Sequence, residues 1–180
     1  WFSASAVVPA LRRDWDVSAF QATLLTVAVQ IGFVVGAVTS AALNLADRFP
    51  AHRVVALSAL VAAAATGLIA LAVDGMPWAV TLRFVTGLAL AGVYPVGMKL
   101  MTSWFDRGRG FALGVLIAAL TLGSAMPQLV SSLASLPWRG VLATASVSAV
   151  LGAVVAWVLV RPGPLARPAP PLAPRFVLSL

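Results

Sequence analysis

Six apolar stretches alternate with short polar ones along this sequence, and every stretch after the first is long enough to cross a bilayer as a helix. About twenty consecutive apolar residues span the hydrocarbon core. The pattern therefore predicts an all-α membrane protein with six transmembrane helices. The first helix should end near Pro9 and be truncated, and we expect the chain to be a fragment cut at both ends. The predicted spans are residues 1–10, 20–45, 54–73, 77–101, 111–133 and 137–160.

The fourth predicted span carries an arginine among apolar residues. Arg83 lies six residues after Pro77, which corresponds to a rise of roughly 9 Å along a helix. An ionisable side chain inside the membrane is expensive and is a functional candidate by default. A long arginine can also extend to the nearer interface or pack between helices. Both interpretations of Arg83, a substrate or coupling residue and a packing residue, stay open at this point.

Helical periodicity gives the same span two different faces. Arg83, Gly87 and Tyr94 fall on one face and could offer a cation and a phenol to a cavity, whereas Gly92 points roughly the opposite way. A glycine on that side permits a neighbouring helix to approach closely. Pro95 predicts a kink because proline removes one backbone hydrogen bond.

Two other spans carry polar stripes. In the second span, Thr26 and Gln30 continue a stripe that begins at Thr23, and Gly32 with Gly36 forms a pair of small residues suited to helix packing. In the fifth span the stripe contains Gly114, Thr121 and Gln128, with Pro127 as a second expected kink. Such stripes either line a solute cavity or form hydrogen bonds between helices.

Composition supports a membrane protein and excludes several other classes. The chain is 61% hydrophobic and only 9% charged, and its basic residues lie between apolar runs instead of on one polar surface, so no nucleic-acid partner is expected despite the net charge of +7. It has no cysteine and one histidine; a metal site or a cofactor is not expected. The basic loops at 46–53 and 102–110 and the basic tail predict a cytoplasmic location for that side.

Two motifs carry a resemblance to the major facilitator superfamily, and it covers nearly the whole chain. The segment LNLADRFPAHR resembles the family signature Gly-x-x-x-Asp-Arg at Asp47 and Arg48, although Leu43 replaces its first glycine. The segment LRFVTGLALAG, residues 82–92, is similar to the family's signature in the fourth helix, with Arg83 and Gly87 in register. The sequence also resembles bacterial nitrate, nitrite and cyanate carriers.

The resemblance implies a secondary transporter that works by alternating access. It implies that residues 1–160 form the N-terminal half of a twelve-helix fold with two inverted three-helix repeats, that 161–175 form a proline- and arginine-rich cytoplasmic linker, and that 176–180 begin a second half. Asp47 and Arg48 would latch the cytoplasmic side. The expected partners are the lipid bilayer, a small-molecule or ion substrate and the C-terminal half of the same chain, in the inner (plasma) membrane of a bacterium.

The charge pattern favours a small anion as the solute, because Arg83 is the one charged residue deep in these spans. The substrate, the coupling ion and the choice among symport, antiport and uniport stay open. An alternative is a complete six-helix protein that acts as a homodimeric half-transporter or a scaffold. An intramembrane enzyme is not expected, because no paired catalytic groups occur at membrane depth.

Overall fold

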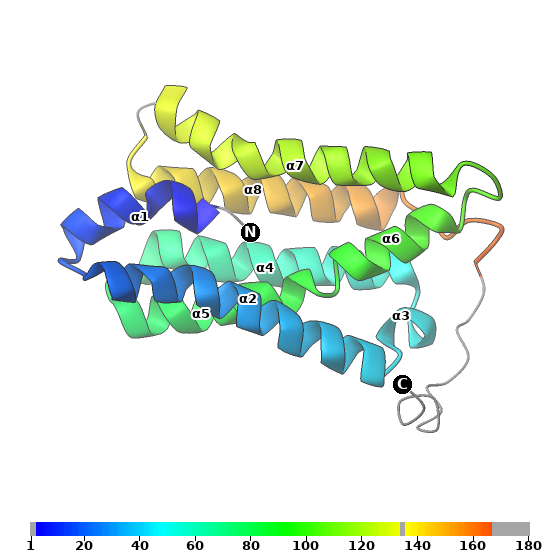
Figure 1. Ribbon diagram of the computed structural model, residues 1–180, viewed down its shortest axis with the longest axis horizontal. Helices are drawn as coiled ribbons and strands as arrows, with labels where there is room; N and C mark the ends of the chain where they lie inside the picture. The colour runs from blue at the N-terminus through cyan, green and yellow to red at the C-terminus, as the bar shows by residue number, and fades with distance from the viewer. Residues whose placement is uncertain (1–2, 134–135, 167–180) are drawn as a thin grey trace.

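The computed structural model describes residues 3–133 and 136–166, and all regular structure in these ranges is helical (Figure 1). The predicted linker beyond residue 166 and the predicted start of a second half lie outside the described residues. The helices are α1 Ser3–Asp14, α2 Ala19–Ala42, α3 Leu45–Arg48, α4 Ala51–Ala72, α5 Met76–Leu90, α6 Tyr94–Thr102, α7 Arg109–Leu133 and α8 Trp138–Val158.

Five spans in the described part of the chain are long and apolar enough to cross a membrane, with α5 and α6 counting together as one span over Met76–Thr102. Helix α1, with 12 residues, precedes them and is shorter. The predicted all-α membrane class, with a shorter first helix followed by membrane-length ones, is confirmed.

The predicted end of the first helix was wrong. Helix α1 continues through Pro9 to Asp14, so residues expected in a polar loop are helical. Val7 and Leu11, one helical turn apart, are both buried in the core beside Pro9. Their burial favours a continuous helix, which offsets the backbone hydrogen bond that a proline inside a helix removes.

The fourth span is two helices where a single kinked helix was predicted. The chain turns at residues 91–93, where the N–H of Gly92 bonds to the carbonyl of Ala89, and α6 begins again at Tyr94 with Pro95 in its first turn. A proline is well accommodated there because the first N–H groups of a helix have no partner inside it. Tyr94 therefore belongs to a new helix, and continuous periodicity does not determine its face relative to Arg83, so their shared face stays a prediction.

Helix α4 lies at the centre of the bundle, packed against α5, α6 and α8 (Figure 1). Its small residues make this possible: Ala56, Ala63 and Ala65 are buried. Helix α2 packs mainly on α5. At one end of the bundle, residues of α1, α2, α4, α5 and α8 form the main apolar core, which includes Leu11, Leu25, Ile69, Ala79 and Val141.

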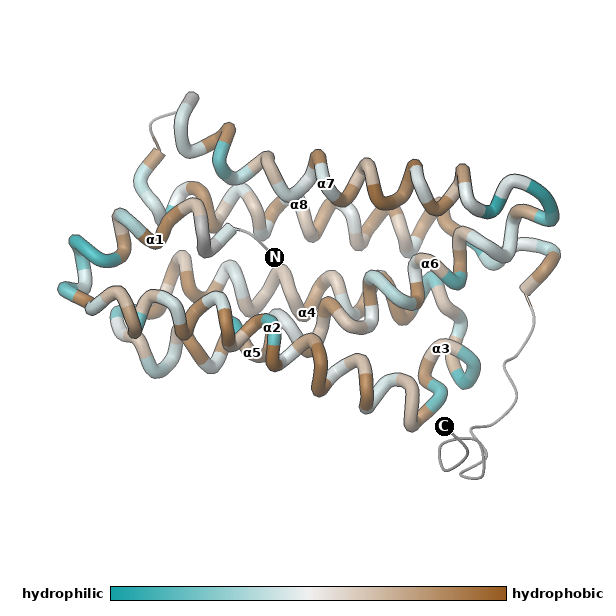
Figure 2. Tube along the Cα trace, viewed as in Figure 1, coloured by the Kyte–Doolittle hydropathy of each residue, from teal (hydrophilic) through white to brown (hydrophobic). Residues whose placement is uncertain are grey.

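Helix α7 lies at the edge of the bundle and packs against α1, α6 and α8. Of the side chains described in α7, only Ala112 is buried. Its ribbon bends away in the last turns (Figure 1), and the helix contains Pro127, the residue at which the sequence predicts a kink. The hydropathy colouring in Figure 2 places most of the teal segments toward the two ends of the bundle and mainly brown or pale ones between them.

Candidate functional site

Arg83 lies inside the bundle, one turn beyond the buried Ala79 on α5, and only 2% of its surface is exposed. It is seven residues into the helix, a rise of roughly 10 Å. Thr86, also buried on this helix, bonds through its hydroxyl to the carbonyl of Leu82. The burial argues against an outward-reaching arginine. A solute reaches this guanidinium only if the side chain or the neighbouring helices move.

The α2–α5 contact is built on glycines, and this determines how closely the two helices approach. A Cβ atom at Gly36 would lie 2.6 Å from the carbonyl oxygen of Leu88, and one at Gly87 would lie 2.9 Å from the backbone nitrogen of Phe33. At Gly32 a Cβ would meet the backbone of Phe84 even more closely. Backbone touches backbone along this interface, so any side chain at these positions would push α2 and α5 apart.

Gly92 occupies the turn between α5 and α6 and faces α4. A Cβ at this position would lie 2.9 Å from the Cβ of Ser58. The break in the fourth span is thus packed directly against the central helix. Ser58 and Thr66 give α4 most of its polar character within the membrane, and Thr66 is buried.

The polar residues predicted on α2 do not point into the core. Thr26 is half-buried and Gln30 is exposed, whereas their helix neighbours Ala28 and Val29 are buried. Tyr94, in the first turn of α6, is half-buried. An apolar groove of about 350 Å³ runs between α2 and α5, with Ala28, Ile31 and Phe84 among its lining residues, and Arg83 is not one of them.

The polar residues predicted on α7 are exposed and lie on a helix with different packing partners. Thr121 bonds through its hydroxyl to the carbonyl of Ile117 on the same helix, and Gln128 is exposed. Because α7 packs on α1, α6 and α8, the structure does not gather the predicted site residues of α2, α5 and α7 into one closed pocket.

Asp47 of the short helix α3 forms an ion pair with Lys99 of α6. Both groups are partly buried, and they line a cleft of about 400 Å³ that also contacts Ser103 and Arg109. Arg48, the other predicted latch residue, is exposed. The pair ties the 43–50 connection to the end of the fourth span. The sequence predicts that loops 46–53 and 102–110 lie on the same side of the membrane, but it does not indicate the pairing of Asp47 with Lys99.

The segment after α8 is strapped onto the end of α6 by contacts that sequence reasoning missed. The N–H of Gly163 donates to the hydroxyl of Ser103 at 2.9 Å, the N–H of Leu165 donates to the carbonyl of Ser103 at 3.0 Å, and the indole of Trp104 donates to the carbonyl of Arg161 at 2.9 Å. Gly163 is required here, because a Cβ would lie 2.5 Å from the carbonyl carbon of Ser103. We refer to residues 161–166 as the strap.

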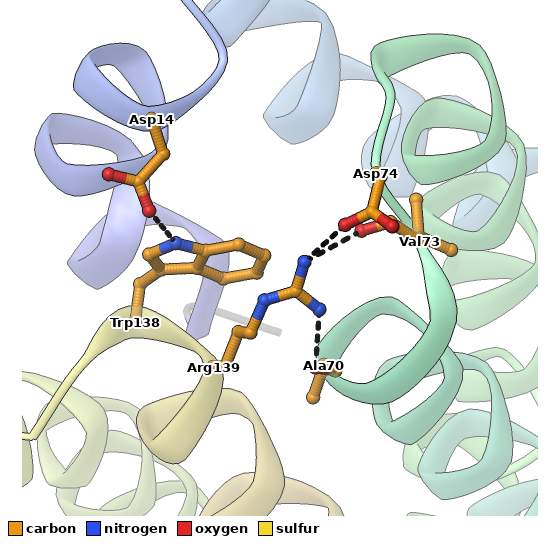
Figure 3. Close-up of polar contacts among 6 residues, drawn as sticks. All are labelled: Asp14, Ala70, Val73, Asp74, Trp138 and Arg139. Carbon is orange, nitrogen blue, oxygen red and sulfur yellow. Dashed lines mark hydrogen bonds and ion pairs between the residues drawn. The ribbon is translucent and has the colours of Figure 1, made fainter.

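The opposite end of the bundle is closed by a second polar cluster (Figure 3). The guanidinium of Arg139 donates to the carbonyls of Ala70 and Val73 at the end of α4 and pairs with Asp74. It also lies 4.6 Å from the ring centroid of Trp138. The cluster satisfies carbonyls at a helix C-terminus with a cation, an arrangement that the helix dipole favours.

No group of three histidine, cysteine, aspartate or glutamate side chains suited to a metal ion occurs within the described residues. The functional candidates are therefore the buried guanidinium of Arg83 and the paired charges at the α3–α6 end.

Comparison of the sequence with known proteins places this chain in a family. A family model described as Major Facilitator Superfamily matches residues 1–179. The chain belongs to the Major Facilitator Superfamily. It is accordingly an integral membrane protein, in agreement with its five membrane-length spans. The resemblance seen at Asp47 and Arg83 is thereby confirmed at the level of the superfamily, while the likeness to nitrate-type carriers stays a prediction.

A curated transporter is similar in sequence to part of this chain. It is the niacin transporter NiaP of Acinetobacter baylyi (strain ATCC 33305 / BD413 / ADP1), which is 31% identical over 132 residues. The aligned region covers 68% of this chain and 29% of NiaP, so the chain spans well under half the length of that relative. No solved structure matches the chain with significant similarity.

Proposed function

We infer that this chain is the N-terminal six-helix half of a secondary active transporter that carries a small anion by alternating access. The observation that supports this most directly is the burial of Arg83, a cation held inside a membrane span of a Major Facilitator Superfamily chain. Such a charge is expensive in hydrocarbon and has its usual use in a solute or ion pathway. A guanidinium forms paired hydrogen bonds with a carboxylate or a planar oxyanion.

The similarity to NiaP supports an organic carboxylate as one candidate substrate. Niacin carries a carboxyl group, which is ionised at neutral pH, as carboxyl groups generally are. The alignment with NiaP, at 31% identity, covers 68% of this chain. We assign further residues to the solute pathway: Thr26 and Gln30 on α2, Tyr94 on α6, and Thr121 and Gln128 on α7.

A second six-helix half completes the pathway in this proposal. The surfaces of α2 and α7 away from their packing partners expose both apolar and polar residues, including Gln30 and Gln128. A second half, on the same polypeptide, would pack there and convert these exposed polar groups into the wall of a cavity near the midplane. The strap at 161–166 would lead toward it from the α3–α6 end.

The orientation follows the distribution of basic residues. The α3–α6 end, with Arg48, Arg53, Lys99, Arg107 and Arg109, would face the cytoplasm of a bacterium. In this orientation Asp47 and Lys99 form part of a cytoplasmic gate. The Asp47–Lys99 pair would hold the N-terminal half together on that side while the latch of Asp47 and Arg48 engages the second half.

The full-length protein, reconstituted in proteoliposomes, tests the substrate class. Vesicles loaded with unlabelled solute should accumulate external labelled nicotinate or labelled nitrate by counterflow, whereas labelled choline, a cation of similar size to nicotinate, should not accumulate. Accumulation of choline with no accumulation of either anion would contradict the proposal.

A further inference from the structure

Arg53 and Arg161 form a cationic pair of side chains at the start of α4 and just beyond the end of α8. The Cζ atom of Arg53 lies 5.7 Å from the ring centroid of Trp157. Arg161 follows Trp157 by one helical turn and donates to the carbonyls of Trp157 and Val160. Both arginines are exposed, and within the described ranges neither forms an ion pair with a carboxylate. Two uncompensated guanidinium groups thus flank one exposed tryptophan.

The surface that extends from these arginines toward the middle of the bundle is apolar. On α4, Leu57 and Leu60 lie on the helical face of Arg53, and on α8, Val154 and Val150 lie on the face of Trp157. All four are exposed; Leu57, for example, is 54% exposed. Figure 1 shows α4 and α8 running side by side, and the two helices pack together. The two apolar faces meet at the contact between Arg53 and Trp157.

We propose that Arg53, Arg161 and Trp157 bind the headgroup of an anionic phospholipid whose acyl chains lie along the apolar surface of α4 and α8. The charge is complementary, because a phosphodiester carries one negative charge and a guanidinium binds phosphate oxygens in a paired geometry. The depth of the site also suits a lipid headgroup, because a tryptophan such as Trp157 prefers the boundary between headgroups and hydrocarbon. Basic groups between transmembrane helices are a known form of anionic-lipid site.

The proposed lipid site lies at the start of α4, so a bound lipid would act on the contact between α4 and the strap. Arg53, in the first turn of α4, and Arg161, just beyond α8, bring two positive charges to this end of the α4–α8 pair. A phosphate would offset their mutual repulsion. It would also join the first turn of α4 to the strap, since Arg161 is the strap residue whose carbonyl accepts the bond from Trp104.

The test measures lipid retention by the detergent-solubilised full-length protein with native mass spectrometry. Dioleoyl phosphatidylglycerol should be retained in preference to dioleoyl phosphatidylcholine, which has the same chains and no net charge. In the double variant Arg53→Gln/Arg161→Gln the affinity for phosphatidylglycerol should fall roughly 25-fold, about fivefold for each arginine.

The matched control is Arg48→Gln/Arg107→Gln, which removes two exposed charges from the same end of the bundle; among the described contacts, those with Trp157 come from Arg53 and Arg161. It should retain phosphatidylglycerol nearly as the unmodified protein does. Equal losses in the two double variants, or no preference of the unmodified protein for phosphatidylglycerol, would overturn the proposal. Displacement of the lipid by millimolar glycerol phosphate would also overturn it, because the site would then recognise free phosphate instead of a lipid.

Discussion

The indole of Trp138 donates a hydrogen bond to the Oδ2 atom of Asp14, 2.6 Å away and 124 positions earlier in the sequence (Figure 3). The bond joins the start of α8 to the end of α1. Trp15 reinforces it with an edge-to-face contact on Trp138, at 5.5 Å between ring centroids. The donor is largely buried and the acceptor is charged, a combination that makes a hydrogen bond stronger than a neutral surface one.

Trp138→Phe should therefore lower the thermal stability of the full-length protein. The change keeps an aromatic ring in the core and removes the donor to Asp14, at a cost of about 2 kcal/mol for a hydrogen bond to a charged group. Differential scanning fluorimetry in detergent measures the shift. Trp78→Phe is the matched control, because Trp78 is 71% exposed and belongs to no described hydrogen bond. Equal shifts in the two variants would contradict a role for the Trp138–Asp14 bond.

Gly87→Ala should reduce the yield of folded protein strongly. The added methyl group would meet the backbone of Val29 and Phe33 and force α2 away from α5, and overpacking of this kind costs about 1–3 kcal/mol or more. Gly97→Ala on α6 is the control, since a Cβ there meets no atom within 4 Å. Gel filtration of a fluorescent fusion should show a monodisperse peak for the control and a diminished one for Gly87→Ala. Similar peaks would mean that the close approach of the helices is dispensable.

Asp47 and Lys99 should behave as one unit in transport. Asp47→Asn and Lys99→Met each remove the ion pair, so the double variant should lose little more activity than the worse single one. Initial uptake rates in proteoliposomes give the coupling energy, for which about 1 kcal/mol is expected for a partly buried pair. Arg109→Met, which lines the same cleft without an ion pair among the described residues, provides the control. Strict additivity of the Asp47 and Lys99 effects would contradict the pairing.

The strap should become accessible when its hydrogen bonds are removed. This chain contains no cysteine, so a Leu165→Cys reporter can be labelled with a maleimide once any other cysteine of the full-length protein is replaced. Ser103→Ala removes the bond to the N–H of Gly163 and should raise the labelling rate several-fold. Thr144→Ala, on α8, removes a hydroxyl that bonds only to its own helix in the described structure and should leave the rate unchanged. An unchanged rate in Ser103→Ala would contradict the strap.

Much of the architecture could be predicted from the sequence because apolar run length is a strong signal in membrane proteins. Arg83 and the glycines at 32, 36, 87 and 92 could be singled out for a similar reason: charge and the absence of a side chain are both conspicuous in apolar helices. The structure places these glycines at close helix contacts and buries Arg83. Whether Arg83 meets a solute stays a prediction.

The remaining features depend on contacts between distant residues, which periodicity does not reveal. The passage of α1 through Pro9 depends on the burial of Val7 and Leu11 by other helices. The division of the fourth span means that the periodicity of one continuous helix no longer determines the face of Tyr94. The strap joins residues about 60 positions apart, and each of its bonds uses a backbone group of residues 161–165 whose partner on the Ser103–Trp104 side the sequence pattern does not indicate; the tight fit at Gly163 becomes visible only in three dimensions.

Uptake of the anion that the full-length protein carries fastest in the counterflow screen, compared between the unmodified protein and Arg83→Gln, tests the account most directly. We expect the uptake rate of Arg83→Gln to be roughly tenfold to hundredfold lower, which corresponds to the loss of one charge-assisted contact. The gel-filtration profile of this variant should be unchanged, and Arg83→Lys should recover part of the uptake rate. Arg12→Gln, which removes an exposed arginine in the last turn of α1, should transport normally. A folded Arg83→Gln variant that takes up the anion at the rate of the unmodified protein would contradict the assignment of Arg83 to the solute pathway.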